Sequence, residues 1–307
     1  MGQFNQLPQS MAYPKPKRVL LMAKKKELLK AYENLDFLNS SEARAIRILS
    51  EYIEPKSKFK KHKVQDTIVF FGSARLKSRK NALAEVNKFK TMDPKSNSKF
   101  AEQLRAAQHH LNMSKYYEDA VKLSKRLTEW ALNLPTKGYR FIVCTGGGPG
   151  IMEAANKGAK QAGGYSVGLN ISIPFEQFVN THVTKDLSFE FHYFFMRKFW
   201  FAYLAKCLIC FPGGFGTMDE LFEMLTLIQT EKMRKKLLVV LYDEKYWNEI
   251  INFQGLIDHA VISPTDMNVF SFCNSTDQAY KIITEHLEKN YLRKVDEKEQ
   301  APELLLK

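Results

Sequence analysis

Cysteine is scarce in this sequence, with four residues in a chain of 307. So few cysteines do not build a disulfide scaffold in a chain of this length, and a reducing compartment is the expected setting. Cys207 and Cys210 have the C-x-x-C spacing of a metal or redox motif, yet no second Cys pair or His pair accompanies them to complete a zinc site. The stretch "KCLICFP" instead predicts a buried strand, and no metal is expected.

The sequence also lacks a long uninterrupted apolar run. Its longest apolar stretch, residues 189–211, contains Arg197, Lys198 and Lys206, and charges within a membrane span are costly. The first residues, "MGQFNQLPQSM", show no charged-then-apolar leader of a secretory signal, and Gln6 stands where a myristoylation signal requires Ser or Thr. We therefore expect a cytoplasmic protein without membrane association.

Acidic residues are outnumbered, 33 against 46 basic ones, which gives a net charge of +13. Residues 1–64 hold 14 Lys and Arg against 6 Asp and Glu, so most of the excess lies there. Basic runs are usually solvated surface, and no helix-turn-helix, zinc finger or aromatic RNA-binding motif accompanies them. A nucleic-acid-binding protein is therefore disfavoured, while contact of this arm with RNA or a membrane is left open as a minor alternative.

Apolar strands and helices alternate from Asp66 onward. Strands are expected at "TIVFFGSAR", whose end is a loop, and at "YRFIVCTGG", "YSVGLNIS", "CLICFPGG", "KLLVVLYD" and "NVFSFC". All-apolar strands that alternate with helices predict an α/β fold: a doubly wound, mostly parallel, Rossmann-like sheet with helices on both faces. A basic, partly helical extension over residues 1–64 precedes this Rossmann-like domain at 65–292, and a flexible tail follows at 293–307.

The helices are predicted from the spacing of apolar residues. Residues 77–98 predict either a helical insertion or a mobile loop. Residues 99–134 predict a long amphipathic helix, with an interruption near Asn112 left open. The segment at about 172–190 is expected to be irregular. Further helical spacing is found at about 28–35, 41–52, 151–162, 191–206, 217–230, 246–259 and 276–290.

Two glycine-rich turns follow predicted strands: "TGGGPGIMEAA" at 145–155 and "PGGFGTMDE" at 212–220. Ligands of open parallel sheets bind at the carboxyl ends of the strands, where such turns lie. Glycines let the backbone approach a ligand closely, and the helix that follows adds a partial positive charge. Both turns therefore suit a phosphate, with a purely structural tight turn as the alternative.

Neither turn fits a standard nucleotide motif. Ile151 stands where G-x-G-x-x-G requires its last glycine, and no G-x-x-x-x-G-K-[ST] occurs. These absences point away from NAD and from ATP hydrolysis. A mononucleotide or a sugar phosphate remains.

The aromatic helix expected at 191–206 contains Arg197 and Lys198. A buried guanidinium needs an anionic partner, which Glu220 or a bound phosphate supplies, but a structural ion pair or an exposed helix edge would also explain it. Glu220 has an alternative of its own, because Thr217 to Glu220 match the capping box S/T-x-x-E at a helix start. The pattern alone does not rank catalysis above capping.

These stretches together resemble the LOG family, the nucleoside 5′-monophosphate phosphoribohydrolases that release cytokinin bases and carry the older label "lysine decarboxylase-like". The family motif P-G-G-x-G-T-x-x-E is matched at 212–220 and its R-K dipeptide at "MRK", while "GGGPGIMEAANKGA" and "FGSAR" look like its longer bacterial members. The resemblance covers about residues 66–290. It implies hydrolysis of the N-glycosidic bond of an AMP-like or cytokinin nucleotide to free base and ribose 5-phosphate, with no cofactor.

The resemblance also implies roles for particular residues. Glu220 matches the catalytic acid and Arg197 the catalytic arginine, and members of the family are homodimers or larger. The rival interpretation is a non-catalytic protein that binds or carries a nucleotide or a phosphorylated cofactor such as molybdopterin. The residues implied in substrate binding are Gly147, Gly148, Gly214, Gly216 and Thr217 for the phosphate, with Lys198, Ser73, Arg75 and Glu153 as weaker candidates.

Overall fold

The computed structural model describes residues 28–93, 99–173 and 178–292. The chain divides into two compact units, Met1–Arg47 and Ile48–Lys307, and the boundary falls inside helix α2 (Arg44–Lys61). The domain boundaries predicted from the sequence stay predictions, and the expected tail at 293–307 lies outside the described residues. Within the described ranges, no helix has both the length and the apolar character needed to cross a membrane.

The described part of the first unit holds short helices. A 3-10 turn at Ala31–Glu33 precedes α1 (Leu35–Leu38), whose first turn is capped by the Asn34 side chain accepting from the Phe37 amide at 3.2 Å. The segment 28–35, where the sequence predicts helical spacing, therefore contains only the 3-10 turn at Ala31–Glu33 and the first residue of α1. An Asn cap competes with continuation of a helix through it, because its side chain satisfies the amides of the helix that follows.

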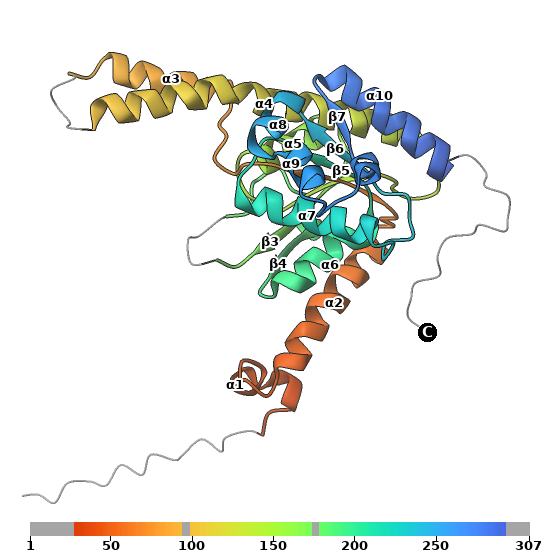
Figure 1. Cartoon of the computed structure of the whole chain (residues 1–307). Coiled ribbons are helices and arrows are strands. Elements are labelled where there is room, and N and C mark those ends of the chain that lie inside the picture. Colours follow the sequence, from red (N-terminus) through yellow and green to blue (C-terminus); the bar gives the residue numbers. More distant parts are fainter. Residues whose placement is uncertain (1–27, 94–98, 174–177, 293–307) are drawn as a thin grey trace, which may run out of the picture. The chain divides into compact units, whose positions relative to one another are not determined.

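The second unit is built on a seven-stranded sheet in the order β4-β3-β2-β1-β5-β6-β7. Figure 1 shows strands of this sheet among the helices that surround them. Every neighbouring pair is parallel, so the predicted α/β, Rossmann-like sheet is confirmed. The chain order reverses at β1, whose neighbours are β2 and β5. The strands are β1 (Thr67–Phe71), β2 (Ile142–Thr145), β3 (Ser166–Ile171), β4 (Ser188–Phe191), β5 (Ala205–Cys210), β6 (Leu238–Tyr242) and β7 (Ser271–Cys273).

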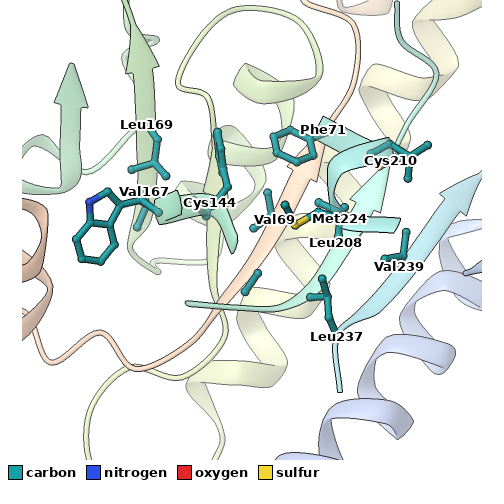
Figure 2. Close-up of a cluster of buried hydrophobic side chains, with 14 of the residues drawn as sticks. Val69, Phe71, Cys144, Val167, Leu169, Leu208, Cys210, Met224, Leu237 and Val239 are labelled. Atoms are coloured by element: carbon teal, nitrogen blue, oxygen red, sulfur yellow. The ribbon is translucent and has the colours of Figure 1, made fainter. Parts of the chain in front are cut away.

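Both faces of the sheet are buried. Successive side chains of β1 enter different hydrophobic clusters, Val69 and Phe71 on one face and Ile68 and Phe70 on the other, as the two-residue period of a strand requires. Figure 2 shows the first cluster, in which these two residues pack with side chains from neighbouring strands such as Leu208. Burial on both faces explains why the strand sequences are apolar throughout.

The helices of the second unit agree with the prediction at most positions. The segment at 77–98 contains a helix, α3, while α4 runs without interruption through Asn112. The expected helix at 246–259 is divided into two, because Asn252 caps a new helix by accepting from the Gly255 amide at 2.8 Å. The helices are α3 (Arg79–Lys90), α4 (Phe100–Leu132), α5 (Ile151–Gln161), α6 (Phe194–Leu204), α7 (Phe215–Gln229), α8 (Glu244–Ile250), α9 (Phe253–Asp258) and α10 (Thr276–Leu287).

The segment expected to be irregular contains strand β4. Its sequence, "SFEF", places Phe189 and Phe191 in the core and exposes Glu190. Glu190 accepts from the side chains of Asn170 (2.6 Å) and Ser172 (2.8 Å) at the end of β3. The expectation of an irregular stretch was therefore wrong at 188–191, because these contacts join residues that are distant in sequence.

Candidate functional site

A cavity of about 750 Å³ lies at the carboxyl ends of β1, β2 and β5, where the strand order reverses. Ligands of doubly wound sheets bind at such a switch point. Three segments provide most of its lining: the turn after β1, the turn after β5 and the first half of α6. Of the residues predicted for the site, those that line this cavity are Ser73, Arg75, Arg197, Gly214, Gly216, Thr217 and Glu220.

The turn after β5 presents unpaired backbone amides to the cavity. Helix α7 begins at Phe215 with Gly214 as its N-cap and without a side-chain cap. The first amide donating back along the helix is that of Met218, to the Gly214 carbonyl at 3.0 Å, so the amides before it have no acceptor within the helix. At Gly213 a Cβ would collide with the Thr217 side chain, so only glycine lets this hydroxyl pack against the turn. Such an arrangement suits an anion.

The capping-box interpretation of Glu220 was wrong. Thr217 is the third residue of α7 instead of its cap, because the helix begins two residues earlier, and Glu220 lies in the second turn. A carboxylate there is too far along the helix to reach the cap amide. Its side chain turns to a neighbouring helix.

Glu220 is paired with Arg197 of α6. Arg197 Nη2 donates to Glu220 Oε1 at 2.9 Å, and Glu220 is only 2% exposed. The Arg197 guanidinium also lies 5.6 Å and 5.5 Å from the ring centres of Phe194 and Phe201. The sequence offered Glu220 or a bound phosphate as the anion beside Arg197, and in the structure the anion beside it is Glu220.

Two polar atoms of this pair are left without a partner. Glu220 Oε2 and Arg197 Nε are buried and have no hydrogen bond to any described residue. Leaving such atoms unpaired costs about 1–3 kcal/mol each, and more for charged groups. A ligand hydroxyl would donate to Glu220 Oε2, and a ligand hydroxyl or phosphate oxygen would accept from Arg197 Nε.

Burial raises the pKa of Glu220 above its ordinary value, and the positive charge and hydrogen bond of Arg197 oppose this rise. The Lys198 charge opposes it more weakly. The ionised form of Glu220 therefore depends mainly on Arg197.

Lys198 does not line this cavity. Its ammonium pairs with Asp219 and Glu223 of α7, both at 2.9 Å, and faces a separate groove on the outside of α7. Partial burial acts to lower the pKa of Lys198, but its bonds to the two carboxylates raise it overall. Neighbouring residues of a helix point about 100° apart, so only one member of the R-K dipeptide reaches the cavity.

The turn after β2 is held closed by its own hydrogen bonds. The Gly147 amide donates to Thr145 Oγ1 at 2.9 Å, and the Gly147 and Gly148 carbonyls accept from the Asn180 side chain at 2.9 Å and 3.0 Å. Neither glycine lines the cavity, whereas Gly146 does. Asn180 was missed because it lies in the segment read as irregular.

The turns after β1 and β2 are joined directly. The Ile151 amide donates to the Ser73 carbonyl at 3.1 Å. Gly150 has φ of +70°, and a Cβ there would collide with the same carbonyl, so this position requires glycine. Glu153 accepts from the Tyr117 hydroxyl at 2.9 Å and lines a neighbouring cavity instead.

Further residues of the cavity carried no signal in the sequence. They are apolar or aromatic side chains that any core would contain, and distant segments bring them to this place. The Tyr246 hydroxyl donates to the Gly213 carbonyl at 2.9 Å and so steadies the turn after β5. The missed lining residues include Leu76, Met113, Met152, Ile171, Phe194, Phe215 and Tyr246.

Cys207 and Cys210 lie buried in β5, so the prediction of a buried strand there is confirmed. Among the described residues, no group of three or more His, Cys, Asp or Glu side chains is placed to hold a metal ion.

Comparison with known proteins gives several matches. A family model described as "Possible lysine decarboxylase" matches residues 152–283. The cytokinin riboside 5′-monophosphate phosphoribohydrolase LOG5 of Arabidopsis thaliana is 26% identical over 202 residues, which cover 61% of this chain and 81% of that protein. LOG7, of the same description and organism, is 28% identical over 152 residues, 48% of this chain and 64% of that protein. A solved Moco carrier protein from Chlamydomonas reinhardtii has 18% identity and a TM-score of 0.40, over 73% of this chain and 99% of that one.

Proposed function

From the similarity to the LOG family, predicted by the motifs and confirmed by these matches, we propose that this chain is a nucleoside 5′-monophosphate phosphoribohydrolase. It cleaves the N-glycosidic bond of an AMP-like or cytokinin nucleotide and releases the free base and ribose 5-phosphate. The relatives bear that activity in their names. The matched sequence positions Arg197 and Glu220 supply a catalytic pair in the cavity.

One observation carries the proposal. Glu220 Oε1 is held by Arg197 at 2.9 Å while Oε2 is buried and unpartnered beside an anion-binding helix start. A structural ion pair would have its remaining oxygen satisfied by protein, because buried polar atoms in folded proteins are nearly always hydrogen-bonded. The free oxygen is therefore assigned to a substrate hydroxyl or to the attacking water.

The start of α7 binds the phosphate of the nucleotide, and the Glu220 carboxylate acts at the ribose carbon C1′. The 5′-phosphate binds the amides at Gly214 and Gly216 and the Thr217 hydroxyl, which directs the ribose towards Glu220. As the bond from C1′ to the base nitrogen breaks, its electron pair leaves with the base and positive charge develops on C1′. An ionised carboxylate stabilises such an oxocarbenium-like transition state. The water oxygen bonds to C1′, and the proton it loses balances the charge on the departing base.

Arg197 acts by keeping Glu220 ionised in a buried place. Without a cation, a carboxylate with this exposure would take up a proton and lose the charge that stabilises C1′. The rings of Phe194 and Phe201 beside the guanidinium limit its motion. Lys198, Gly147, Gly148 and Glu153 stay candidates only for indirect roles, since they do not line the cavity.

We also propose that the functional form is at least a homodimer in the cytoplasm. Three large side chains on α6 and α7, Phe195, Phe199 and Phe222, are exposed by 54%, 37% and 39%. Aromatic side chains are enriched at protein interfaces. Light scattering of the full chain tests this proposal, and a monomer at micromolar concentration would contradict it.

The experiment for the proposed function is a substrate panel. The purified chain is incubated with AMP, GMP, CMP, UMP and isopentenyl-AMP, and the free base is measured by chromatography. Base release from at least one of them supports the enzyme. Tight binding of a nucleotide with no base from any of them would favour the carrier interpretation, whose ligand class extends to phosphorylated cofactors such as molybdopterin.

A further inference from the structure

The cavity has more room and a different chemistry than the phosphate and the ribose require. Apart from Arg197, Thr217 and Glu220, its described lining residues with polar side chains are Ser73, Arg75 and Tyr246. The Tyr246 hydroxyl already donates to Gly213, Ser73 Oγ accepts from the Arg75 backbone amide at 3.1 Å, and Arg75 itself is exposed at the edge of the cavity. The described lining contains no Asn, Gln, Asp, His or Lys. The remaining side chains are Phe71, Ala74, Leu76, Met113, Met152, Ile171, Ile173, Phe194, Phe201, Pro212, Phe215 and Met218.

Two of these aromatic rings stand open to solvent. Phe215 is the first residue of α7 and is 92% exposed, and Phe194 is the first residue of α6 and is 52% exposed. A ring that could bury its surface would gain about 1.5–3 kcal/mol, so such exposure beside a cavity leaves free energy for a ligand to recover. The two helix starts also carry the anion site and the Arg197 pair. A flat ligand that is held there meets both rings.

We infer that Phe215 and Phe194 stack on the base of the nucleotide and that this pocket reads the base by ring area, without reading its hydrogen-bonding edge. The inference rests on the proposed function, because it takes the phosphate and ribose positions from it. Stacking on aromatic side chains tolerates any base, since every base has a π-face. Large discrimination between bases of similar size requires buried hydrogen-bonding groups, which the described wall does not provide.

The inference fixes the pattern of substrate preference. AMP, GMP and IMP are expected to have kcat/KM values within about tenfold of one another, because their rings present similar stacking area. Purine nucleotides are expected to exceed CMP and UMP. An apolar substituent on the base is tolerated, because most of the other lining side chains are apolar.

Substitutions with matched controls test the stacking. Phe215→Ala is expected to raise KM for AMP about tenfold or more, to affect CMP less, and to leave competitive inhibition by ribose 5-phosphate unchanged. Phe215→Trp restores a ring and the purine preference. Phe222→Ala on the same helix is the control for the loss of an exposed ring outside the cavity; because Phe222 also belongs to the proposed subunit contact, the two variants are compared in the same oligomeric state. Phe194→Ala is paired in the same way with Phe195→Ala, whose ring is 54% exposed and outside the cavity.

Three results would overturn the inference. The first is a difference above a hundredfold between AMP and GMP in the wild type. The second is an equal loss of ribose 5-phosphate and AMP affinity in Phe215→Ala, which would place the residue in the anion site. The third is a change of oligomeric state in Phe215→Ala with the purine preference retained, which would make the ring a subunit contact.

Failure of the proposed function gives a separate signature. If the wild type releases no base, calorimetric binding of AMP, GMP and ribose 5-phosphate still tests the stacking. AMP and GMP binding tighter than ribose 5-phosphate, with the excess lost in Phe215→Ala, sustains the inference while refuting hydrolysis. If AMP and GMP bind no tighter than ribose 5-phosphate, the stacking inference is refuted.

Discussion

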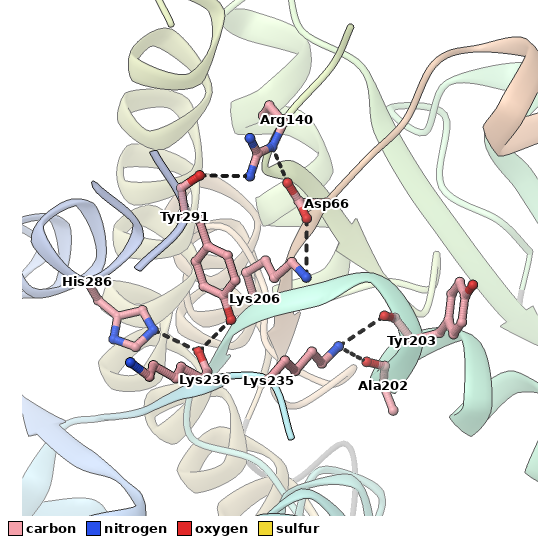
Figure 3. Close-up of polar contacts among 9 residues, drawn as sticks. All are labelled: Asp66, Arg140, Ala202, Tyr203, Lys206, Lys235, Lys236, His286 and Tyr291. Atoms are coloured by element: carbon pink, nitrogen blue, oxygen red, sulfur yellow. Dashed lines mark hydrogen bonds and ion pairs between the residues drawn. The ribbon is translucent and has the colours of Figure 1, made fainter. Parts of the chain in front are cut away.

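Buried charges gather at both ends of the sheet, and the two groups differ in how completely their polar atoms are paired. At the amino ends of β1 and β5, Asp66 accepts from Arg140 and from Lys206, the latter at 3.4 Å (Figure 3). None of these three side chains has a buried atom without a partner. At the carboxyl ends, Arg197 and Glu220 each keep one unpartnered atom. The closed cluster is therefore interpreted as structural and the open pair as a binding site.

Glu220→Gln tests the functional interpretation of the Arg197 and Glu220 pair with the largest expected effect. It removes the charge that stabilises C1′, and we expect kcat to fall by about a thousandfold, in the range of losses seen for preorganised electrostatic groups. The glutamine keeps the size of the side chain, and the adjoining cavity lets water hydrate Arg197, so the melting temperature should change little. Kinetics with AMP and thermal unfolding measure the two effects. Normal turnover in this variant would remove Glu220 from catalysis.

Asp66→Asn should have the opposite effects: a large loss of stability and little change in kcat. It leaves Arg140 and Lys206 without the carboxylate between them, and breaking a buried charge network of this kind costs about 3–5 kcal/mol. Urea unfolding should show the loss of stability, while kcat per folded molecule stays near that of the wild type. A loss of kcat as large as in Glu220→Gln would show that the amino-end cluster is also functional.

The pH dependence of activity tests how Arg197 controls Glu220. Burial raises the pKa of Glu220 and Arg197 opposes the rise, so activity should fall as the pH drops through a value above the ordinary 4.5. In Arg197→Gln this acid limb should move to higher pH, because the main opposing charge is lost. Lys198→Gln serves as the control and should move it less. An acid limb that is the same in all three proteins would contradict the assigned dependence.

Lys235 offers a smaller effect at the amino ends of the strands. Its ammonium donates to the carbonyls of Ala202 and Tyr203, the latter at 3.0 Å, and burial lowers its pKa from 10.5 to about 7 (Figure 3). Between these two pH values the unfolded chain binds more protons than the folded one, so the free energy of unfolding should rise with pH. Lys235→Met should flatten this rise.

The control for Lys235→Met is Lys236→Met at the exposed neighbouring position. The free energy of unfolding of both variants and of the wild type is measured by urea titration at several pH values between about 7 and 10.5, the two pKa values of Lys235 in the folded and unfolded chain. An equal slope in all three proteins would show that Lys235 is not the group responsible.

The sequence predicted the sheet and the need of Arg197 for a nearby anion, with Glu220 as one of two candidates, because both follow from local chemistry. Apolar β-branched runs indicate buried strands, and a guanidinium in an apolar helix indicates a nearby anion. What it could not predict depends on contacts between distant segments. The start of α7 was placed too late, because Gly214 begins the helix without a side-chain cap. Strand β4 was missed because Glu190 is held by residues at the end of β3.

The same distinction applies to the glycine-rich turns. Both sequences suggested a phosphate site, but of the predicted glycines only Gly214 and Gly216, in the turn after β5, line the cavity. The turn after β2 uses Gly147 and Gly148 to meet Asn180 and Thr145. A glycine-rich pattern indicates that another group lies close to the backbone. Only the structure shows whether that group is a side chain of the protein or whether the space is open to a ligand.

The central claim is most directly tested by the products formed from AMP. Hydrolysis at C1′ by the open Arg197 and Glu220 pair predicts adenine and ribose 5-phosphate in equal amounts, with no adenosine and no inorganic phosphate. Adenosine with inorganic phosphate, or AMP recovered intact from a tightly bound complex, would contradict it.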